Sequence, residues 1–351
     1  MPTIHAAELT GFASDLLEAV GVGHDEAAVV AASLVGANLR GHDSHGVMRL
    51  PQYVGFIEQG QYRHGVGLKV EHETPAAIVC DGQWGLGQVQ AHRLLDRAVP
   101  KAREMAVAVA TARDCGHIGR LGEYAERAAS LGLMLLATVN NGGAAQRVAP
   151  PGGLEPRLST NPFCAGVPTT DPDAPIVVDF GTSVVAEGKV RDYYISKRPV
   201  PKNWLLDHWG QPTTDPSVLY QPPMGSILPL GGAQSYKGFG LGLILDLWAG
   251  GLSGGGCSQA AQQHVPGNNI FFLVLDPGRL GGTGLLISQA ADLANWIRAT
   301  PRAPGVDGIL LPGDPERLTM GDRTARGIPL DDSHWTKLVD LARRLEVKIP
   351  E

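Results

Sequence analysis

Residues 107–140 read VAVATARDCGHIGRLGEYAERAASLGLMLLATVN, and this stretch decides the class of fold. Its apolar start, residues 107–112, predicts a strand, and the apolar run at 133–140 predicts a second, buried strand. Between them, Gly116-His117-Ile118-Gly119 predicts the opening of a helix that runs to about residue 131. A strand, a glycine-rich turn, a helix and another strand in this order are typical of an α/β fold.

The sequence on either side extends this alternation. Further strands are expected at 77–80, 176–180, 271–276 and 309–311. Helices are expected at 6–20, 25–39, 44–59 (which Pro51 could open), 88–105, 238–249, 286–299 and 332–345, the last capped by Asp332 or Ser333. Irregular structure is expected at 60–75, 142–170 and 190–235. The sequence therefore predicts helical layers from both chain ends around a middle that contains a sheet.

The bulk composition excludes several classes of protein. Gly and Pro account for 46 and 26 of the 351 residues, well above the usual share of about 12%, but 43% hydrophobic residues argue against disorder. A net charge of -6 offers no basic surface to nucleic acid, and the longest apolar stretch, 239–252, is too short to span a bilayer. With no visible signal peptide and four widely spaced cysteines, we expect a soluble cytoplasmic protein with reduced thiols.

The densest group of reactive side chains is RGHDSHGVMR at residues 40–49. His42 and His45 could bind a metal from one helix face, but zinc needs a third and a fourth ligand and no HExxH motif supplies them. Ser44 and His45 could form a hydrolase pair, yet adjacent helical residues do not face each other and the chain has no GxSxG elbow. A solvated polar helix end would account for the same residues without any chemistry.

A further interpretation of this segment combines His45 with Arg49. The two are four residues apart, so a helix would place them on one side. An imidazole that titrates near neutral pH beside a fixed cation provides a proton donor and a carboxylate clamp. Reduction of a 2-oxo acid or its imine needs both, because the carbonyl oxygen takes up a proton as hydride arrives and the substrate carboxylate needs a bidentate partner.

Residues 116–122, GHIGRLG, form a second candidate site. A strand, a glycine turn and a helix N-terminus together make an anion site, because free N–H groups and the helix dipole favour phosphate, and Arg120 would reinforce it. The spacing is GxxGxxG, and neither the GxGxxG of a Rossmann turn nor a P-loop occurs. An ordinary turn before a helix explains the pattern equally well.

Other segments carry residues that could contact a ligand. Asn161 precedes Pro162 and must leave the helical region, so the pair Thr160 and Asn161 could offer hydrogen-bond donors, although a structured turn explains it too. Residues 179–183 end a strand, a position where α/β sheets often bind ligands. Three pieces are each compatible with a scaffold role alone: Lys189, Lys237-Gly238 and Pro312-Gly313.

Taken together, the chain resembles the malate/L-lactate dehydrogenase type 2 oxidoreductases. The resemblance rests on the order of RGHDSHGVMRLPQYV, GHIGRLGEYA, APPGGLEPRLSTNPF, VVDFGTSVVAEGKV, YKGFGLGL and LPGD, and it covers nearly the whole chain. That family includes malate, sulfolactate, lactate and ureidoglycolate dehydrogenases, diketogulonate reductase and reductases of cyclic imino acids such as piperideine- or pyrroline-2-carboxylate. The ordered set is far more specific than any one of its motifs.

The resemblance implies a fold, a cofactor and an assembly. It implies NAD or NADP bound on a fold that is not Rossmann, a carboxylate substrate, no metal, and a homodimer with its active site near the domain cleft. We accordingly expect residues 1–75 plus 235–351 to form a helical domain for substrate binding and dimerisation. Residues 76–234 would form the NAD(P)-binding sheet domain.

The resemblance also assigns roles to single residues. His45 would donate the proton, Ser44 would hydrogen-bond to it, and Asp192 would polarise the site. The substrate would be held by Arg49, Thr160, Asn161 and Lys189. The cofactor would be held by His117, Ile118, Gly119, Arg120, Leu121, Asp179, Phe180, Gly181, Lys237, Gly238, Pro312 and Gly313.

Two departures from the family pattern bear on cofactor and substrate preference. The family commonly has His-Lys-Gly where this chain has Tyr236-Lys237-Gly238, and Met-Ala-Thr-Ser where this chain has Phe-Gly-Thr-Ser at residues 180–183. The expected reaction is hydride transfer between nicotinamide and C2 of a 2-oxo or 2-hydroxy acid such as malate or lactate. The alternatives are a reductase of cyclic imino acids and a metal-dependent hydrolase that uses His42 and His45.

Overall fold

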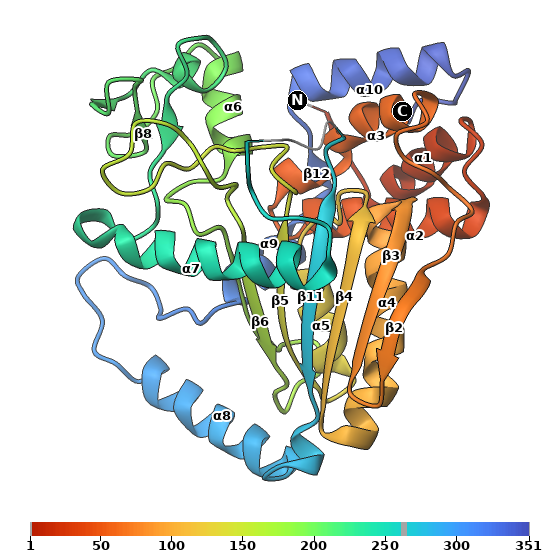
Figure 1. Ribbon diagram of the computed structural model, residues 1–351, viewed down its shortest axis with the longest axis vertical. Coiled ribbons are helices and arrows are strands. Elements are labelled where there is room, and N and C mark those ends of the chain that lie inside the picture. Colours follow the sequence, from red (N-terminus) through yellow and green to blue (C-terminus); the bar gives the residue numbers. More distant parts are fainter. Residues whose placement is uncertain (1, 261–264, 351) are drawn as a thin grey trace.

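A seven-stranded mixed sheet forms the centre of the computed structural model, which describes residues 2–260 and 265–350 (Figure 1). In spatial order the strands are β2 (Lys69–Thr74), β3 (Ala77–Gly85), β4 (Val107–Cys115), β11 (Asn268–Leu275), β5 (Met134–Asn140), β6 (Phe163–Val167) and β7 (Ile176–Phe180). Strands β3 and β4 pair in parallel, whereas the other neighbours in this order are antiparallel. The predicted α/β class is confirmed.

Strand β11 lies in the middle of the sheet although it comes late in the chain. Its Phe272 is paired with Ala110 of β4 on one side and with Ala137 of β5 on the other. The strand thus brings a piece of the expected helical segment 235–351 into the sheet. The division of the chain into two domains stays a prediction.

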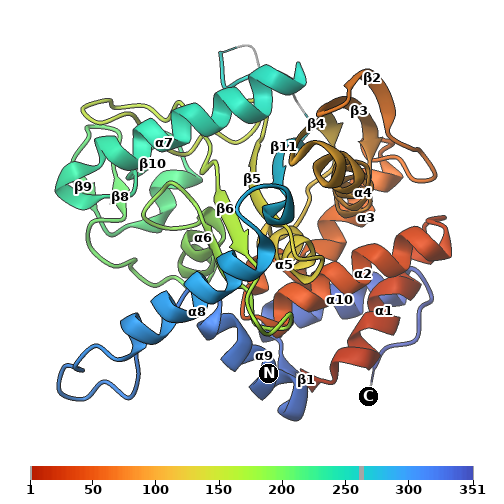
Figure 2. The same cartoon turned by 90° about the horizontal axis from the view of Figure 1, so that it is seen from below.

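Helices cover both faces of this sheet (Figure 2). One face carries α4 (Gly87–Met105) and α5 (Gly122–Ser130), and the other carries α7 (Tyr236–Asp246), which continues into a π-helical turn, Leu247–Gly251. The core beneath α4 and α5 is buried, and small residues on β4 such as Ala108 and Ala110 let the helices approach closely. Tyr124 of α5 packs its ring on that of Phe272, with 5.5 Å between the centroids.

Segments from both chain ends share a second hydrophobic core. It is built by α1 (Ala6–Glu18), α2 (His24–Leu39), α3 (Leu50–Glu58) and α10 (Asp332–Arg344), and by the short pair β1 (Thr3–Ile4) and β12 (Ile328–Pro329). Leu9, Leu34, Tyr53 and Leu338 are buried together there. Helices α1, α3 and α10 each have one apolar stripe that must be covered, whereas α2 lies between its neighbours and is buried on more than one side.

Several predicted boundaries are wrong. The stretch 60–75 contains β2, which pairs with β3; 142–170 contains β6; and residues 309–311 form no strand. The helix expected to open at residue 116 begins at Gly122, and the cap of α10 is Asp331, whose carboxylate accepts the Ser333 N–H. The stretch 190–235 contains most of α6 (Glu187–Ile195) and the small sheet β8 (Leu205–Leu206), β9 (Pro212–Thr213) and β10 (Ser226–Ile227).

Two further helices follow β11. Helix α8 (Thr283–Arg298) confirms the prediction at 286–299, whereas α9 (Asp314–Arg326) was not predicted at all. A third, small core lies under α6 and the strands β8 and β10, and includes Val190, Leu205 and Ile227. In the part of the chain that the structure describes, no helix combines the length and apolarity needed to cross a membrane.

Candidate active site

The segment that carries Ser44, His45 and Arg49 is not one helix. It forms two 3-10 turns, η1 (Asp43–His45) and η2 (Val47–Arg49), which Gly46 separates in an extended conformation, with ψ of -159°. Helix α3 then begins at Leu50, with Pro51 in its first turn, where proline costs nothing because the N–H it lacks would be unpaired. The continuous helix expected from residue 44 is therefore wrong at its start.

The two turns nevertheless bring the predicted groups together. Ser44 Oγ lies 3.0 Å from His45 Nδ1, although sequence reasoning held that adjacent residues would not face each other. That argument was wrong because it assumed α-helical geometry. Arg49 folds back onto the same turn and donates from Nε to the Ser44 carbonyl at 2.7 Å and from Nη1 to Gln52 Oε1 at 3.1 Å.

A second histidine, His117, faces His45 across the site. The two rings stack with 5.5 Å between centroids and an interplanar angle of 22°. His117 lies in the loop between β4 and α5. Its backbone N–H donates to the Tyr62 hydroxyl at 3.0 Å. Its Nδ1 accepts the Gly119 N–H at 3.3 Å, which assigns the proton to Nε2 and makes the Tyr53 hydroxyl, 2.6 Å away, a donor to Nδ1.

Both imidazoles are held in the neutral form. Burial, together with the smaller effect of the Arg49 charge, lowers the pKa of His45 to about 3. Burial likewise lowers the pKa of His117 well below its usual range, again with a contribution from Arg49. Desolvation and a nearby cation both disfavour the charged imidazole, so the two effects act in the same direction.

Arg120 and Asp179, both expected at the cofactor, take part in contacts within the protein. Arg120 is 4% exposed and its Nη2 lies 2.6 Å from Glu126 Oε2. Asp179 Oδ2 accepts the N–H of Gly122, the first residue of α5, at 2.7 Å, where a carboxylate stabilises the helix N-terminus. Burial raises the pKa of Asp179, and the charge of Arg120 opposes that rise.

Thr160 and Asn161 lie just before β6, and Asn161 contacts α7. Asn161 is buried and its Nδ2 donates to the carbonyl of Gly242 at 3.0 Å and to Asp246 Oδ1 at 3.3 Å. The Thr182 hydroxyl donates to the Thr160 carbonyl at 3.1 Å. Asn161 therefore joins the sheet to α7, while its Oδ1 is buried without a hydrogen-bond partner among the described residues.

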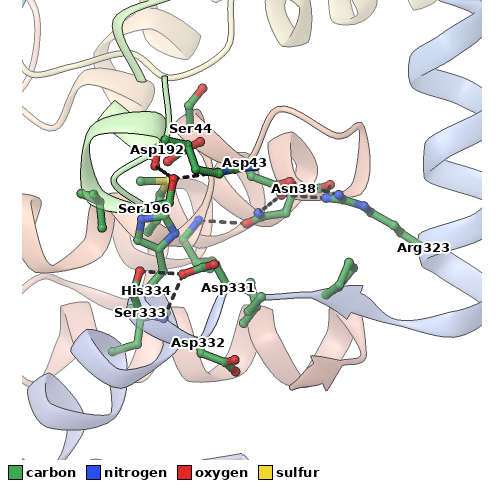
Figure 3. A pocket seen from close by; sticks show the side chains of 17 residues that line it. Asn38, Asp43, Ser44, Asp192, Ser196, Arg323, Asp331, Asp332, Ser333 and His334 are labelled. Atoms are coloured by element: carbon green, nitrogen blue, oxygen red, sulfur yellow. Dashed lines mark hydrogen bonds and ion pairs between the residues drawn. The ribbon is translucent and has the colours of Figure 1, made fainter. Parts of the chain in front are cut away.

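Helix α6 brings the remaining expected catalytic group, Asp192, to the other side of Ser44. A β-carbon added to Gly188 would lie 2.9 Å from Ser44 Cβ, so only glycine allows α6 this close. Ser44 and Asp192 both line a cavity of about 570 Å³ between α6 and the chain-end helices (Figure 3). Burial raises the pKa of Asp192, and the neighbouring His334 opposes that rise.

The other expected contacts occupy varied places. Lys189 and Lys237 are exposed, and Gly238 is buried where a β-carbon would meet the Leu230 carbonyl. The Pro312 carbonyl accepts the Val177 N–H at 3.3 Å, and Gly313 directly precedes α9 with φ of +94°. Phe180 packs its ring on Phe163. Phe180 belongs to the edge strand β7, and the Pro312 carbonyl contacts the same strand at Val177.

His42, the partner in the metal alternative, points to a carboxylate instead of to His45. Its Nε2 lies 3.3 Å from Glu316 Oε1. Within residues 2–260 and 265–350, no group of three or more His, Cys, Asp or Glu side chains could hold a metal ion.

Sequence reasoning missed the residues that orient His117. Tyr53 is hydrogen-bonded to it and also accepts from Gln88 Nε2 at 3.2 Å, while Asn268 Oδ1 accepts the Ile118 N–H at 3.0 Å. Tyr53 follows Arg49 by four residues, a spacing that could have placed it near the site. Asn268 carries no such signal, because only the insertion of β11 into the sheet brings it there.

With this geometry in view, the comparisons with known proteins are decisive. A family model described as malate/L-lactate dehydrogenase matches residues 4–339. This chain belongs to the malate/L-lactate dehydrogenase family. The resemblance inferred from the motifs is thereby confirmed, and the chain is an oxidoreductase of the dehydrogenase type.

Relatives in sequence and in structure span nearly the full chain. Hydroxycarboxylate dehydrogenase B of Escherichia coli O157:H7 is 35% identical over 344 residues, 97% of this chain and 93% of that protein. Malate dehydrogenase from Pyrococcus horikoshii OT3 has a TM-score of 0.89 at 31% identity, over 99% of this chain and 96% of that one. Delta1-piperideine-2-carboxylate reductase from Pseudomonas syringae pvar. tomato has a TM-score of 0.84 at 28% identity, over 97% and 100%.

Proposed function

We propose that this dehydrogenase transfers hydride between a nicotinamide cofactor, NAD or NADP, and C2 of a 2-oxo or 2-hydroxy acid such as malate or lactate. The observation that carries the proposal is the convergence of Ser44, His45 and Arg49 on one pair of turns, opposite His117. These groups supply a proton donor, a hydrogen-bonded partner for it and a carboxylate clamp within a single half-buried cluster.

Arg49 is the group that would hold the substrate carboxylate. Two of its nitrogens are oriented by the Ser44 carbonyl and by Gln52, and among the described residues it forms no ion pair with an acidic side chain. A guanidinium that is positioned but lacks a counter-charge is suited to a planar carboxylate, which it can bind through two parallel hydrogen bonds. The substrate carbon beside that carboxylate would then lie near the His45 imidazole.

Binding of the carboxylate would convert His45 into a proton donor. The pKa of His45 is low because of burial and because of the Arg49 charge. A bound carboxylate offsets that charge, so the pKa rises and the imidazole takes up a proton together with the 2-oxo acid. His45 then protonates the carbonyl oxygen during reduction, and in the reverse direction accepts the proton of the hydroxyl group.

Ser44 and Asp192 would supply that proton from the cavity side. Ser44 contacts His45 Nδ1 and also lines the cavity, so its hydroxyl connects the buried imidazole to the space beside Asp192 (Figure 3). We assign to Asp192 the role of polarising this path. Thr160, Asn161 and Lys189 remain the candidates for further contacts to substrate.

The loop 116–121 would hold the cofactor. The backbone N–H groups of Arg120 and Leu121 donate no hydrogen bond within the described part of the chain and directly precede α5, an arrangement that fits a phosphate group. The nicotinamide, when bound, supplies or accepts the hydride. Because the sheet is mostly antiparallel and the loop lacks GxGxxG, we propose a non-Rossmann mode of binding, completed by residues 179–181, Lys237-Gly238 and Pro312-Gly313.

We also propose a homodimer, which would cover apolar side chains that this chain leaves exposed. On α8, Trp296 is 79% exposed, and Leu285 and Leu293 are more than half exposed. Leu243 of α7 and Leu247, in the π-helical turn that follows it, are exposed as well. Exposed apolar groups of this size commonly mark protein interfaces. In the proposed division into a chain-end helical domain and a sheet domain, α7 and α8 belong to the chain-end domain, which would therefore form the dimer contact.

A cytoplasmic location is the last part of the proposal. All four cysteines are free and three of them are buried, which is typical of proteins that fold in a reducing compartment.

A panel of substrates tests this function directly. The purified protein is mixed with NADH or NADPH and a series of 2-oxo acids, including oxaloacetate and pyruvate, and the loss of nicotinamide absorbance is followed. The similarity to delta1-piperideine-2-carboxylate reductase makes cyclic imino acids the second series. Turnover of 2-oxo acids supports the proposal; turnover of cyclic imines alone would assign the alternative, and turnover of neither series would refute both.

A further inference from the structure

One face of α9 lies against the three residues that precede Ser44. Glu316, Thr319 and Arg323 are spaced by three and four residues, so they share that face. Glu316 contacts His42. A β-carbon built on Gly41 would lie 3.2 Å from Cγ2 of Thr319.

Arg323, at the far end of this face, binds Asp43 with both arms of its guanidinium. Its Nη1 lies 2.6 Å from Asp43 Oδ1 and its Nη2 lies 3.0 Å from Oδ2 (Figure 3). The same Nη1 also donates to the backbone carbonyl of Asn38 in α2. A planar, two-pronged contact of this kind fixes orientation as well as distance. Asp43 is the first residue of the turn that ends at His45.

Asn38 continues this contact to the second turn. Its Nδ2 donates to Asp43 Oδ1 at 2.6 Å and its Oδ1 accepts the Val47 N–H at 2.9 Å. The Asn38 amide therefore connects the residues on either side of Gly46 and packs directly against Gly46. A β-carbon at Gly46 would lie 2.2 Å from Asn38 Oδ1. Arg323, Asp43 and Asn38 thus hold both turns in one fixed relation.

We propose that Arg323 is a positioning residue for the reaction, acting through Asp43 and Asn38 to hold His45 at its stacking distance from His117. The inference rests on the role of His45 as proton donor. Among the described residues, Arg323 contacts neither His45 nor Arg49, so its effect on them is indirect, through Asp43 and Asn38. Its contribution is to the geometry of the donor, and a misplacement of about 1 Å can lower a rate by about 100-fold.

Stability alone does not explain this arrangement. The Arg323 side chain is 15% exposed and the Asp43 side chain is 45% exposed, so water can solvate the Asp43 carboxylate if Arg323 is removed. Ion pairs with such access to solvent contribute little to folding. The loss of Arg323 should therefore leave the protein folded and move the turn that carries His45.

The chain offers a matched control on the same helix. Arg326 is 81% exposed and pairs with Asp322 one turn earlier, away from the active site. We expect Arg323→Gln to lower kcat for 2-oxo acid reduction by about 100-fold. Cofactor affinity, measured by nicotinamide fluorescence, should stay unchanged, and Arg326→Gln should match the wild type in both. Arg323→Lys should retain part of the rate, because lysine keeps the positive charge but cannot bind both oxygens of the Asp43 carboxylate as the guanidinium does.

A double-mutant cycle separates positioning from a general loss. In a His45→Ala background, Arg323→Gln should cause no further decrease of the residual turnover, because residues that act as one unit are not additive. An equal loss in both backgrounds, or an unchanged kcat in folded Arg323→Gln, would overturn the proposal. If Arg323→Gln does not fold, Asp43→Asn carries the same comparison.

A readout without turnover keeps this inference distinct from the proposed function. In histidine-labelled protein the NMR signal of His45, assigned by its absence in His45→Ala, should move in Arg323→Gln and stay in place in Arg326→Gln. A signal that stays in place in both variants refutes the positioning role. This result is obtained even if the wild-type protein reduces none of the 2-oxo acids.

Discussion

The imidazoles of His45 and His117 stack at 5.5 Å between centroids, and one comes from the turn after α2 while the other comes from the loop after β4. The charge of Arg49 lowers the pKa of both, as does burial, which is the larger cause. Two neutral rings can pack face to face where two imidazolium ions would repel. The stacking contact between His45 of the chain-end layer and His117 of the sheet therefore depends on the protonation state of the two imidazoles.

The first prediction concerns stability against pH. An unfolded histidine has a pKa near 6.5, whereas folded His45 has a pKa of about 3, so between these values the unfolded state binds more protons. The contribution of neutral, folded His45 to the free energy of unfolding is therefore complete above about pH 6.5, and it is lost as the pH falls toward 3. We expect Tm to fall over that window in the wild type.

Other groups also titrate in acid, so the part of the pH dependence that comes from His45 has to be separated from theirs. Thermal unfolding of His45→Gln measures that part. Its Tm should depend less steeply on pH between 6.5 and 4 than that of the wild type. His24→Gln is the control, since that histidine is exposed beside Glu18, which raises its pKa. Equal slopes for His45→Gln and the wild type would contradict the lowered pKa.

The second prediction is that His45→Gln loses turnover while it still binds cofactor. A positioned proton donor contributes about 100- to 10,000-fold to a rate, so kcat should fall by that order. Steady-state kinetics gives kcat, and nicotinamide fluorescence gives cofactor affinity. An unchanged kcat would rule out His45 as the donor.

The third prediction concerns Arg49. Hydrogen bonds to charged groups contribute about 1.5–3 kcal/mol, so Arg49→Gln should raise KM for the 2-oxo acid by about 10- to 100-fold. The pKa of His45 should also rise in this variant, because the largest of the charge effects that lower it is gone. Substrate-dependent kinetics and histidine NMR titration measure the two effects. A comparable loss of cofactor affinity would argue against the carboxylate clamp.

The fourth prediction tests the space behind Gly46. Alanine at this position would place a β-carbon 2.2 Å from Asn38 Oδ1, so we expect a loss of about 1–3 kcal/mol in the free energy of unfolding. Gly55→Ala, in the neighbouring α3, is the control, because the nearest atom to its β-carbon would be 4.0 Å away. Denaturant unfolding should show Gly55→Ala to be neutral or slightly stabilised. Equal stabilities would show that the turn has room to adapt.

The fifth prediction tests the homodimer. Trp296→Glu places a charge in the most exposed apolar position of α8 and should convert the dimer to a monomer, as measured by light scattering. Trp209→Glu is the matched control, because that side chain is 69% exposed on a turn outside α7 and α8. A wild-type protein that is monomeric at micromolar concentration, or a Trp296→Glu dimer, would contradict the proposed interface.

The sequence predicts local structure well where one element makes its own pattern. The apolar runs at 107–112, 133–140 and 176–180 each correspond to a strand, and the glycine-rich motifs lead to the family. It fails where partners decide the outcome. Strand β2 is polar and exposed, so only its pairing with β3 makes it a strand. Helix α9 has no fully buried residue, and polar contacts such as the Arg323–Asp43 ion pair hold it in place, so its sequence lacks the apolar spacing that predicts a helix.

The site shows the same division. Ser44, His45, Arg49 and His117 were predicted from motifs and do come together. Arg323, which lies 280 residues after Asp43, could not be predicted, because no local pattern reports which distant helix will face a turn. The two 3-10 turns were also missed, since the choice between them and a helix depends on Asn38 behind Gly46.

The late position of β11 has a consequence for the synthesis of the chain. Strands β4 and β5 leave the ribosome long before residues 268–275, which separate and pair with both of them. Until then, the hydrogen-bonding edges that these two strands present to β11 stay unpaired, and such edges are sites of aggregation. Completion of the sheet is thus a long-range step that follows translation of about three quarters of the chain, and a chaperone that shields β4 and β5 during this interval would raise the yield of folded enzyme.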